Sequence, residues 1–105
     1  MLPYRTAASV VLLLVAISVT LSACETAPPV QEMSDARQAI AVAREADVVD
    51  RAAVELREAE RFLKRAEQSL SQREYDEARE AAMQASERAK NALRMAEADR
   101  ETRFQ

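Results

Sequence analysis

The chain has 105 residues, a net charge of −3 at pH 7, one cysteine, and no His, Gly or Trp. With one cysteine and no histidine, the sequence excludes an intramolecular disulfide and a cysteine–histidine zinc site. The lack of glycine excludes glycine-rich phosphate loops, and the mildly acidic balance gives no basic field. We therefore expect no cofactor, no metal site and no nucleic-acid partner.

The N-terminal segment is organised like a secretory signal. Arg5 precedes an apolar run, and small residues then lead to the cysteine. The tetrapeptide Leu21-Ser22-Ala23-Cys24 resembles the lipobox of bacterial lipoproteins. We predict a lipoprotein signal peptide over residues 1–23, cleaved by signal peptidase II between Ala23 and Cys24, with lipid attached to Cys24.

The alternative is an uncleaved membrane-spanning helix from Thr6 to Ala23, because this run is only just long enough to span.

If Cys24 is acylated, several acyl chains together anchor the protein in effect permanently. The next residue is Glu25, whereas an aspartate there favours inner-membrane retention in well-studied Gram-negative bacteria. We expect a lipid-anchored protein of the cell envelope, and we favour the outer membrane, facing the periplasm, over the inner membrane.

The lipidated N-terminus and a tether are predicted over residues 24–32, because Pro28-Pro29 favours an extended chain. The rest, residues 33–105, is rich in the strong helix formers Ala, Glu, Arg and Leu, which predicts a helical domain. A first helix is expected over about 33–46, beginning between Val30 and Ser34. Its narrow apolar stripe consists of Ala36, Ala39, Ile40, Ala43 and Ala46.

A break or kink is predicted at residues 47–50, where Asp50 could cap the next helix. Two stretches with a coiled-coil spacing of three and four residues come after it. The predicted helix over 50–71 has a seam of Val49, Ala52, Leu56, Ala59, Leu63, Ala66 and Leu70. The predicted helix over 74–103 has a seam of Tyr75, Ala78, Ala82, Ala85, Ala89, Ala92 and Ala96.

The phase of these two seams predicts a turn between them. The second seam is displaced by two residues from the continuation of the first, which is about 200° around a helix. A turn at Ser71-Gln72-Arg73 lets the seams face each other, although no glycine or proline marks it. The predicted fold class is all-α, an antiparallel helical hairpin or a small three-helix bundle. Because a two-helix core is thin, either the first helix completes the unit or copies associate.

Several of these segments resemble the domain of unknown function 4398 family over most of residues 25–100. The resemblance lies in Ala36-Arg37-Gln38-Ala39-Ile40, Glu55-Leu56-Arg57-Glu58-Ala59, Tyr75 and Ala78-Arg79, with the lipobox and Pro-Pro before them. It implies a short envelope lipoprotein and brings no catalytic residues. Family members often have Gly-Asp or Gly-Asn before the tyrosine, whereas this chain has Arg73-Glu74.

We expect that the protein is not an enzyme, because carboxylates on amphipathic helices usually form a solvated face. The leading hypothesis is a structural or protein-interaction role. The expected partners are the bilayer through Cys24, another copy or another envelope protein, and peptidoglycan. A non-covalent peptidoglycan-associated spacer is one alternative, since the end Arg103-Phe104-Gln105 lacks the terminal lysine of wall-linked lipoproteins. A tetratricopeptide-like adaptor is another, although one helix pair is too few for a repeat array.

Overall fold

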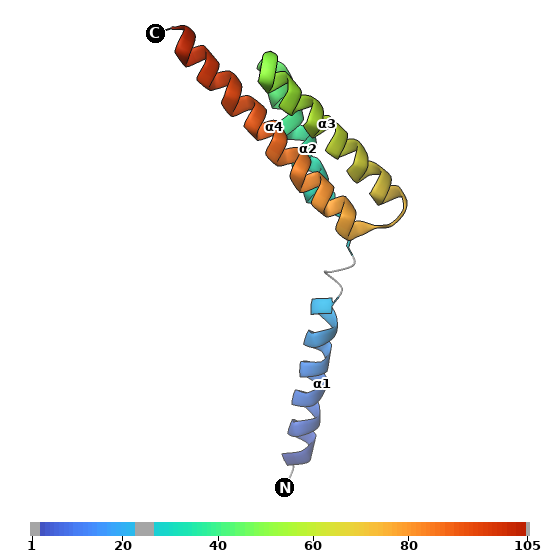
Figure 1. The fold of residues 1–105 in the computed structure, drawn as a ribbon. Helices are drawn as coiled ribbons and strands as arrows, with labels where there is room; N and C mark the ends of the chain where they lie inside the picture. The colour runs from blue at the N-terminus through green and yellow to red at the C-terminus, as the bar shows by residue number, and fades with distance from the viewer. Residues whose placement is uncertain (1–2, 23–26, 105) are drawn as a thin grey trace.

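The computed structural model describes residues 3–22 and 27–104 and contains four helices in this part of the chain (Figure 1). They are α1 (Pro3–Ser22), α2 (Val30–Glu45), α3 (Asp50–Ser71) and α4 (Tyr75–Arg103). Helices α2, α3 and α4 pack on one another, and within the described residues α1 contacts none of them. The all-α prediction is confirmed, and the first helix after the tether completes a three-helix bundle.

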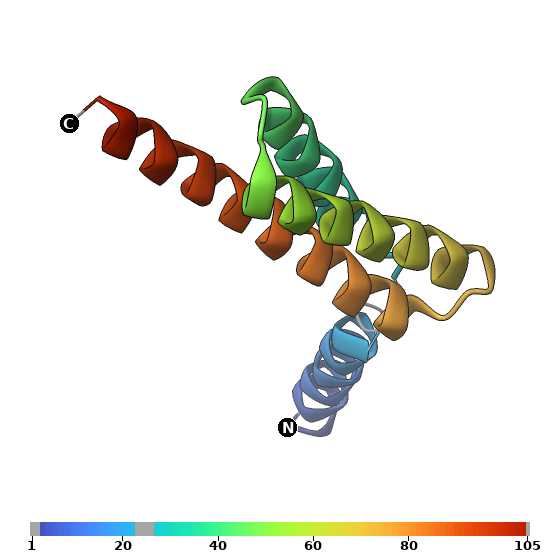
Figure 2. The same ribbon diagram turned by 45° about the horizontal axis from the view of Figure 1, so that its top comes forward.

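Ion pairs show that α2 and α3 run in opposite directions. Arg37 pairs with Glu67 at 3.6 Å, and Arg44, two turns further along α2, pairs with Glu60 at 2.8 Å. Residue numbers rise along α2 as they fall along α3, which fixes an antiparallel pair (Figure 2).

Helix α4 runs antiparallel to α3 and parallel to α2. Its first turns lie beside the start of α2, where Arg79 contacts Glu32 at 3.4 Å. Its last turns lie beside the end of α2, where the Arg100 guanidinium donates to the Ala46 carbonyl. The tether and the α3–α4 turn therefore leave the bundle at one end, and α4 projects past the other end (Figures 1 and 2).

The core consists of large side chains set against alanines. The predicted α4 seam is buried from its second member onward, at Ala78, Ala82, Ala85, Ala89, Ala92 and Ala96. Met33 and Ile40 of α2 are among the largest fully buried side chains, and Leu56 of α3 packs with Ile40 and Ala89. Small residues allow helices to approach closely, and large ones fill the space between the seams.

Two details of the predicted seams are wrong. Val49 lies before α3 and is 45% exposed, so it does not belong to the α3 seam. The predicted α2 stripe lacks Met33, yet this residue is 2% exposed and packs with Ala66, Ala81 and Ala82.

Helix α2 starts at the early edge of the predicted range of Val30 to Ser34, which shortens the predicted tether. Helix α2 begins at Val30, so residues 30–32 are helical rather than extended. Pro29 precedes the helix, and its carbonyl accepts the Met33 amide at 3.0 Å. Proline is compatible with the edge of a helix because the first amides of a helix have no intrahelical partner. The buried Pro29 side chain also fixes where the bundle starts.

The predicted break between α2 and α3 is present. Asp47 and Asp50 have φ of 54° and 55°, in the left-handed region. Asp50 does not cap α3, because Val49 occupies the N-cap position and no side chain makes a capping hydrogen bond. Asp is among the non-glycine residues that tolerate the left-handed region best, which explains its place at both ends of the connection.

The α3–α4 turn is a Schellman motif closed by an arginine. The Glu74 amide donates to the Ser69 carbonyl at 2.9 Å, and the Arg73 amide donates to the Leu70 carbonyl at 3.0 Å. These are the two bonds of that motif, whose left-handed residue is usually glycine. Here Arg73 occupies the position with φ of 60°.

We predict that Arg73→Gly stabilises the bundle. A left-handed conformation costs a residue with a Cβ about 1 kcal/mol relative to glycine, which for a domain of this size raises the melting temperature by about 4–8 °C. Thermal unfolding followed by circular dichroism measures the change. Gln72→Gly is the control, because Gln72 has φ of −90° and gains nothing from glycine. A melting temperature unchanged by Arg73→Gly contradicts the prediction.

We also predict that Ala89→Leu destabilises the bundle by about 1–3 kcal/mol, because a fully packed seam has no room for three more carbons. Ala89 is 0% exposed between α2 and α3. The matched control is Ala98→Leu on an exposed position of the same helix, expected within about 0.5 kcal/mol of wild type. Urea unfolding of both variants tests this, and equal stabilities contradict it.

Candidate functional site

The predicted lipidation site, Cys24, and the predicted cleavage point between Ala23 and Cys24 lie outside the described residues. The described chain resumes at Ala27, three residues after the cysteine. Arg79 Nη2 donates to the Ala27 carbonyl at 3.1 Å, and Arg79 Nε lies 3.4 Å from Glu32 Oε1. One arginine of α4 therefore holds the tether against the bundle.

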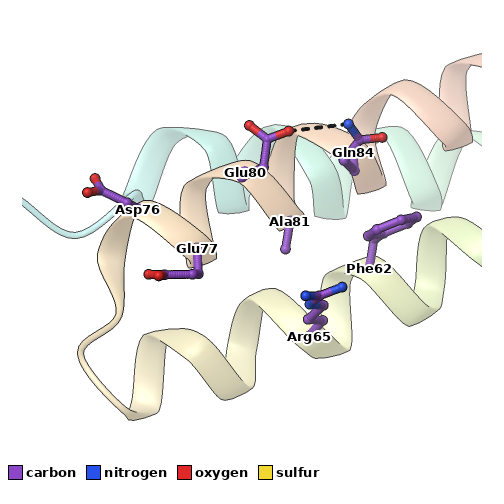
Figure 3. A pocket seen from close by; sticks show the side chains of 7 residues that line it. All are labelled: Phe62, Arg65, Asp76, Glu77, Glu80, Ala81 and Gln84. Carbon is purple, nitrogen blue, oxygen red and sulfur yellow. Dashed lines mark hydrogen bonds between the residues drawn. The ribbon is translucent and has the colours of Figure 1, made fainter.

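A shallow, half-open groove lies between α3 and α4 in the described part of the chain (Figure 3). Its volume is about 340 Å³. Its lining comes from Phe62 and Arg65 on α3 and from Asp76, Glu77, Glu80, Ala81 and Gln84 on α4. The close-up shows Phe62 and Arg65 facing α4 across the groove, with Ala81 between the helices.

The charges along this groove are only partly satisfied. Asp76 pairs with Arg79 at 3.3 Å, and Gln84 donates to Glu80 at 3.3 Å. The side chains of Arg65 and Glu77 have no hydrogen-bond or ion-pair partner among the described residues.

A second shallow groove, with a volume of about 410 Å³, lies between α2 and α4. Ala39, Val42 and Leu93 form its apolar lining, and Asp35, Gln38 and Lys90 form the rest. Val42 is 42% exposed, so part of this apolar lining is open to solvent.

A partly buried polar network joins α3 to α4 beside the first groove. Arg88 Nη1 donates to Glu55 Oε1 at 3.1 Å, and Asn91 Nδ2 donates to Glu55 Oε2 at 3.2 Å. The Arg88 guanidinium also lies 6.0 Å from the centre of the Phe62 ring, within reach of a cation–π contact. The Glu55 side chain is only 17% exposed. Sequence analysis did not find this network, because its members are 33 and 36 residues apart.

The described residues hold no group of three or more His, Cys, Asp or Glu side chains that could bind a metal ion. Across the same residues, no helix combines the length and apolarity needed to cross a membrane.

The family described as Domain of unknown function (DUF4398) matches residues 31–104. The chain belongs to this family. Comparison with curated proteins and with solved structures gives no match. The match to DUF4398 covers α2, α3, the turn between α3 and α4, and α4, so the three-helix bundle is the family domain, whereas the predicted lipobox precedes it.

We predict that Glu55→Ala destabilises this DUF4398 bundle by about 1.5–3 kcal/mol, because it removes hydrogen bonds to a charged group and leaves Arg88 and Asn91 without an acceptor. The control is Glu87→Ala. Glu87 and Arg94 are 69% and 60% exposed, and such surface pairs contribute about 0–1 kcal/mol. Chemical denaturation of both variants compares them, and equal losses contradict a structural role for Glu55.

Proposed function

We propose that this protein is a lipid-anchored protein of the bacterial cell envelope with a non-catalytic structural or protein-interaction role. The observation that carries the proposal is the tetrapeptide Leu21-Ser22-Ala23-Cys24 directly after an apolar run. Signal peptidase II cleaves directly before a lipid-modified cysteine. The only cysteine of the chain, Cys24, lies at the end of this tetrapeptide, which is the position that the enzyme requires.

The bundle supports a role in interaction rather than catalysis. Its carboxylates take part in inter-helix ion pairs, such as Glu60 with Arg44 and Glu67 with Arg37, or lie along exposed helix faces. Its two grooves are lined by mixed charged and apolar side chains from neighbouring helices. We infer that the partners are another copy of the chain or another envelope protein, held near the bilayer by the acylated Cys24.

The geometry of the tether supports the anchored arrangement. Because Arg79 contacts both Ala27 and Glu32, a lipid on Cys24 would fix the end of the bundle that contains the α3–α4 turn close to the membrane. Both grooves run beside α4, and the groove at Phe62 lies towards this end. Glu25, rather than aspartate, supports the outer membrane over the inner membrane.

Metabolic labelling with palmitate tests the anchor. We expect wild type and Ser22→Ala, which keeps a small residue in the lipobox, to take up label and to sediment with membranes. We expect Cys24→Ala to take up no label and to keep residues 1–23, because the acceptor sulfur is gone. A mature chain that begins at Met1 and carries no lipid overturns the proposal, whatever the bundle does. Density-gradient separation of the two membranes locates the labelled protein.

A further inference from the structure

The connection between α2 and α3 holds two residues in an unfavourable conformation. Asp47 and Asp50 have φ of 54° and 55°, where the Cβ of an L-residue crowds the backbone. Between them, the amides of Val48 and Val49 donate no backbone hydrogen bond within the described part of the chain. Chain reversal at this point therefore combines backbone strain with two amides that make no backbone hydrogen bond.

A straight helix through this connection would remove both problems. No glycine occurs in the chain, and no proline comes after Pro29, so nothing between Val30 and Ser71 forbids a continuous helix. In such a helix residues 47–50 would adopt ordinary helical angles, and each of their amides would bond to the carbonyl four residues earlier. Straightening would, however, carry α2 away from its own α3 and α4.

We propose that two copies of this chain exchange α2, so that the α2 of each copy packs on α3 and α4 of the other. The exchange keeps the contacts that α2 makes in one chain. Met33 and Ile40 would enter the partner's alanine seams, and Arg37 and Arg44 would pair with Glu67 and Glu60 of the partner copy. Only the connection at residues 46–50 changes, and short strained connections are known to favour such swapping.

The α3–α4 turn is not the point of exchange. Arg73 is also left-handed there, but the Schellman bonds from Glu74 to Ser69 and from Arg73 to Leu70 satisfy that turn. In addition, α3 and α4 share the most extensive helix contact of the bundle, so α2 is the helix that detaches most easily. The proposal rests on that part of the proposed function in which the partner is another copy, and it makes no use of the lipid.

Charge reversal across the α2–α3 contact distinguishes exchange from side-by-side association. Variant one is Arg37→Glu with Arg44→Glu, and variant two is Glu60→Arg with Glu67→Arg. Within a single chain each variant sets like charges opposite each other. In an exchanged heterodimer the mutated helices face each other and the wild-type helices face each other, so every ion pair is restored.

The full-length variants are unfolded separately, mixed in equal amounts and refolded in non-ionic detergent. Native mass spectrometry then measures the amounts of the two homodimers and of the heterodimer. We expect the heterodimer to exceed each homodimer by about tenfold, since like-charge contacts oppose both homodimers. The control mixes Arg51→Glu/Arg57→Glu with Glu97→Arg/Glu101→Arg, exposed positions without inter-helix pairs, and has the same difference in net charge. It should give the random ratio. Wild type that stays monomeric, or equal ratios in both mixtures, overturns the proposal.

Substitutions in the connection provide a second test that leaves the ion pairs intact. Asp47→Gly/Asp50→Gly removes the strain of the reversed chain and weakens a continuous helix. The dissociation constant of the dimer should therefore increase by about tenfold. Asp47→Ala/Asp50→Ala does the reverse, and the dimer should tighten. Sedimentation of the full chain in detergent measures both dissociation constants, and equal values for the two variants overturn the proposal. Palmitate labelling remains independent of either result.

Discussion

Small side chains along α4 let two other helices lie close against it, and this contact holds the bundle together. Six of the seven predicted seam residues on α4 are buried alanines, and Met33, Ile40 and Leu56 fill the space that they leave. An alanine contributes little apolar area of its own, so the stability comes from how closely the partner side chains fit. That fit explains how a bundle with few aromatic residues can bury its two core clusters.

Polar contacts set the register between these helices, whereas apolar packing holds the helices together. Arg44 with Glu60 and Glu55 with Arg88 and Asn91 set α3 against its two neighbours. Alanine seams alone would fit in several registers, because successive alanines look alike to a partner helix. The same ion pairs would serve equally well between two copies, which is why exchange of α2 keeps the register of the bundle.

The sequence predicted those features of the fold that depend on local periodicity. The two seams, the break near Asp47 and the turn near Ser71 follow from the spacing and phase of apolar residues, and the structure contains all of them. The start of α2 at Val30 lies at the early edge of the predicted range, whereas the N-cap at Val49 was missed, because the strained connection at Asp47 and Asp50 decided it. The network around Glu55 depends on register between distant helices, which periodicity cannot supply. Of the candidate site, Cys24 came from a motif, whereas the groove at Phe62 needed the packed helices.

The attachment of the tether by Arg79 also determines how the domain would carry a mechanical load. A pull on the chain at Ala27 acts on α2 along its axis, and through the guanidinium of Arg79 it reaches α4 at the same level. Since the far end of α4 lies at the opposite end of the bundle, tension between the two ends would slide the helices along one another. Shear of this kind must break many contacts at once, so the domain would resist stretching better than it would resist peeling.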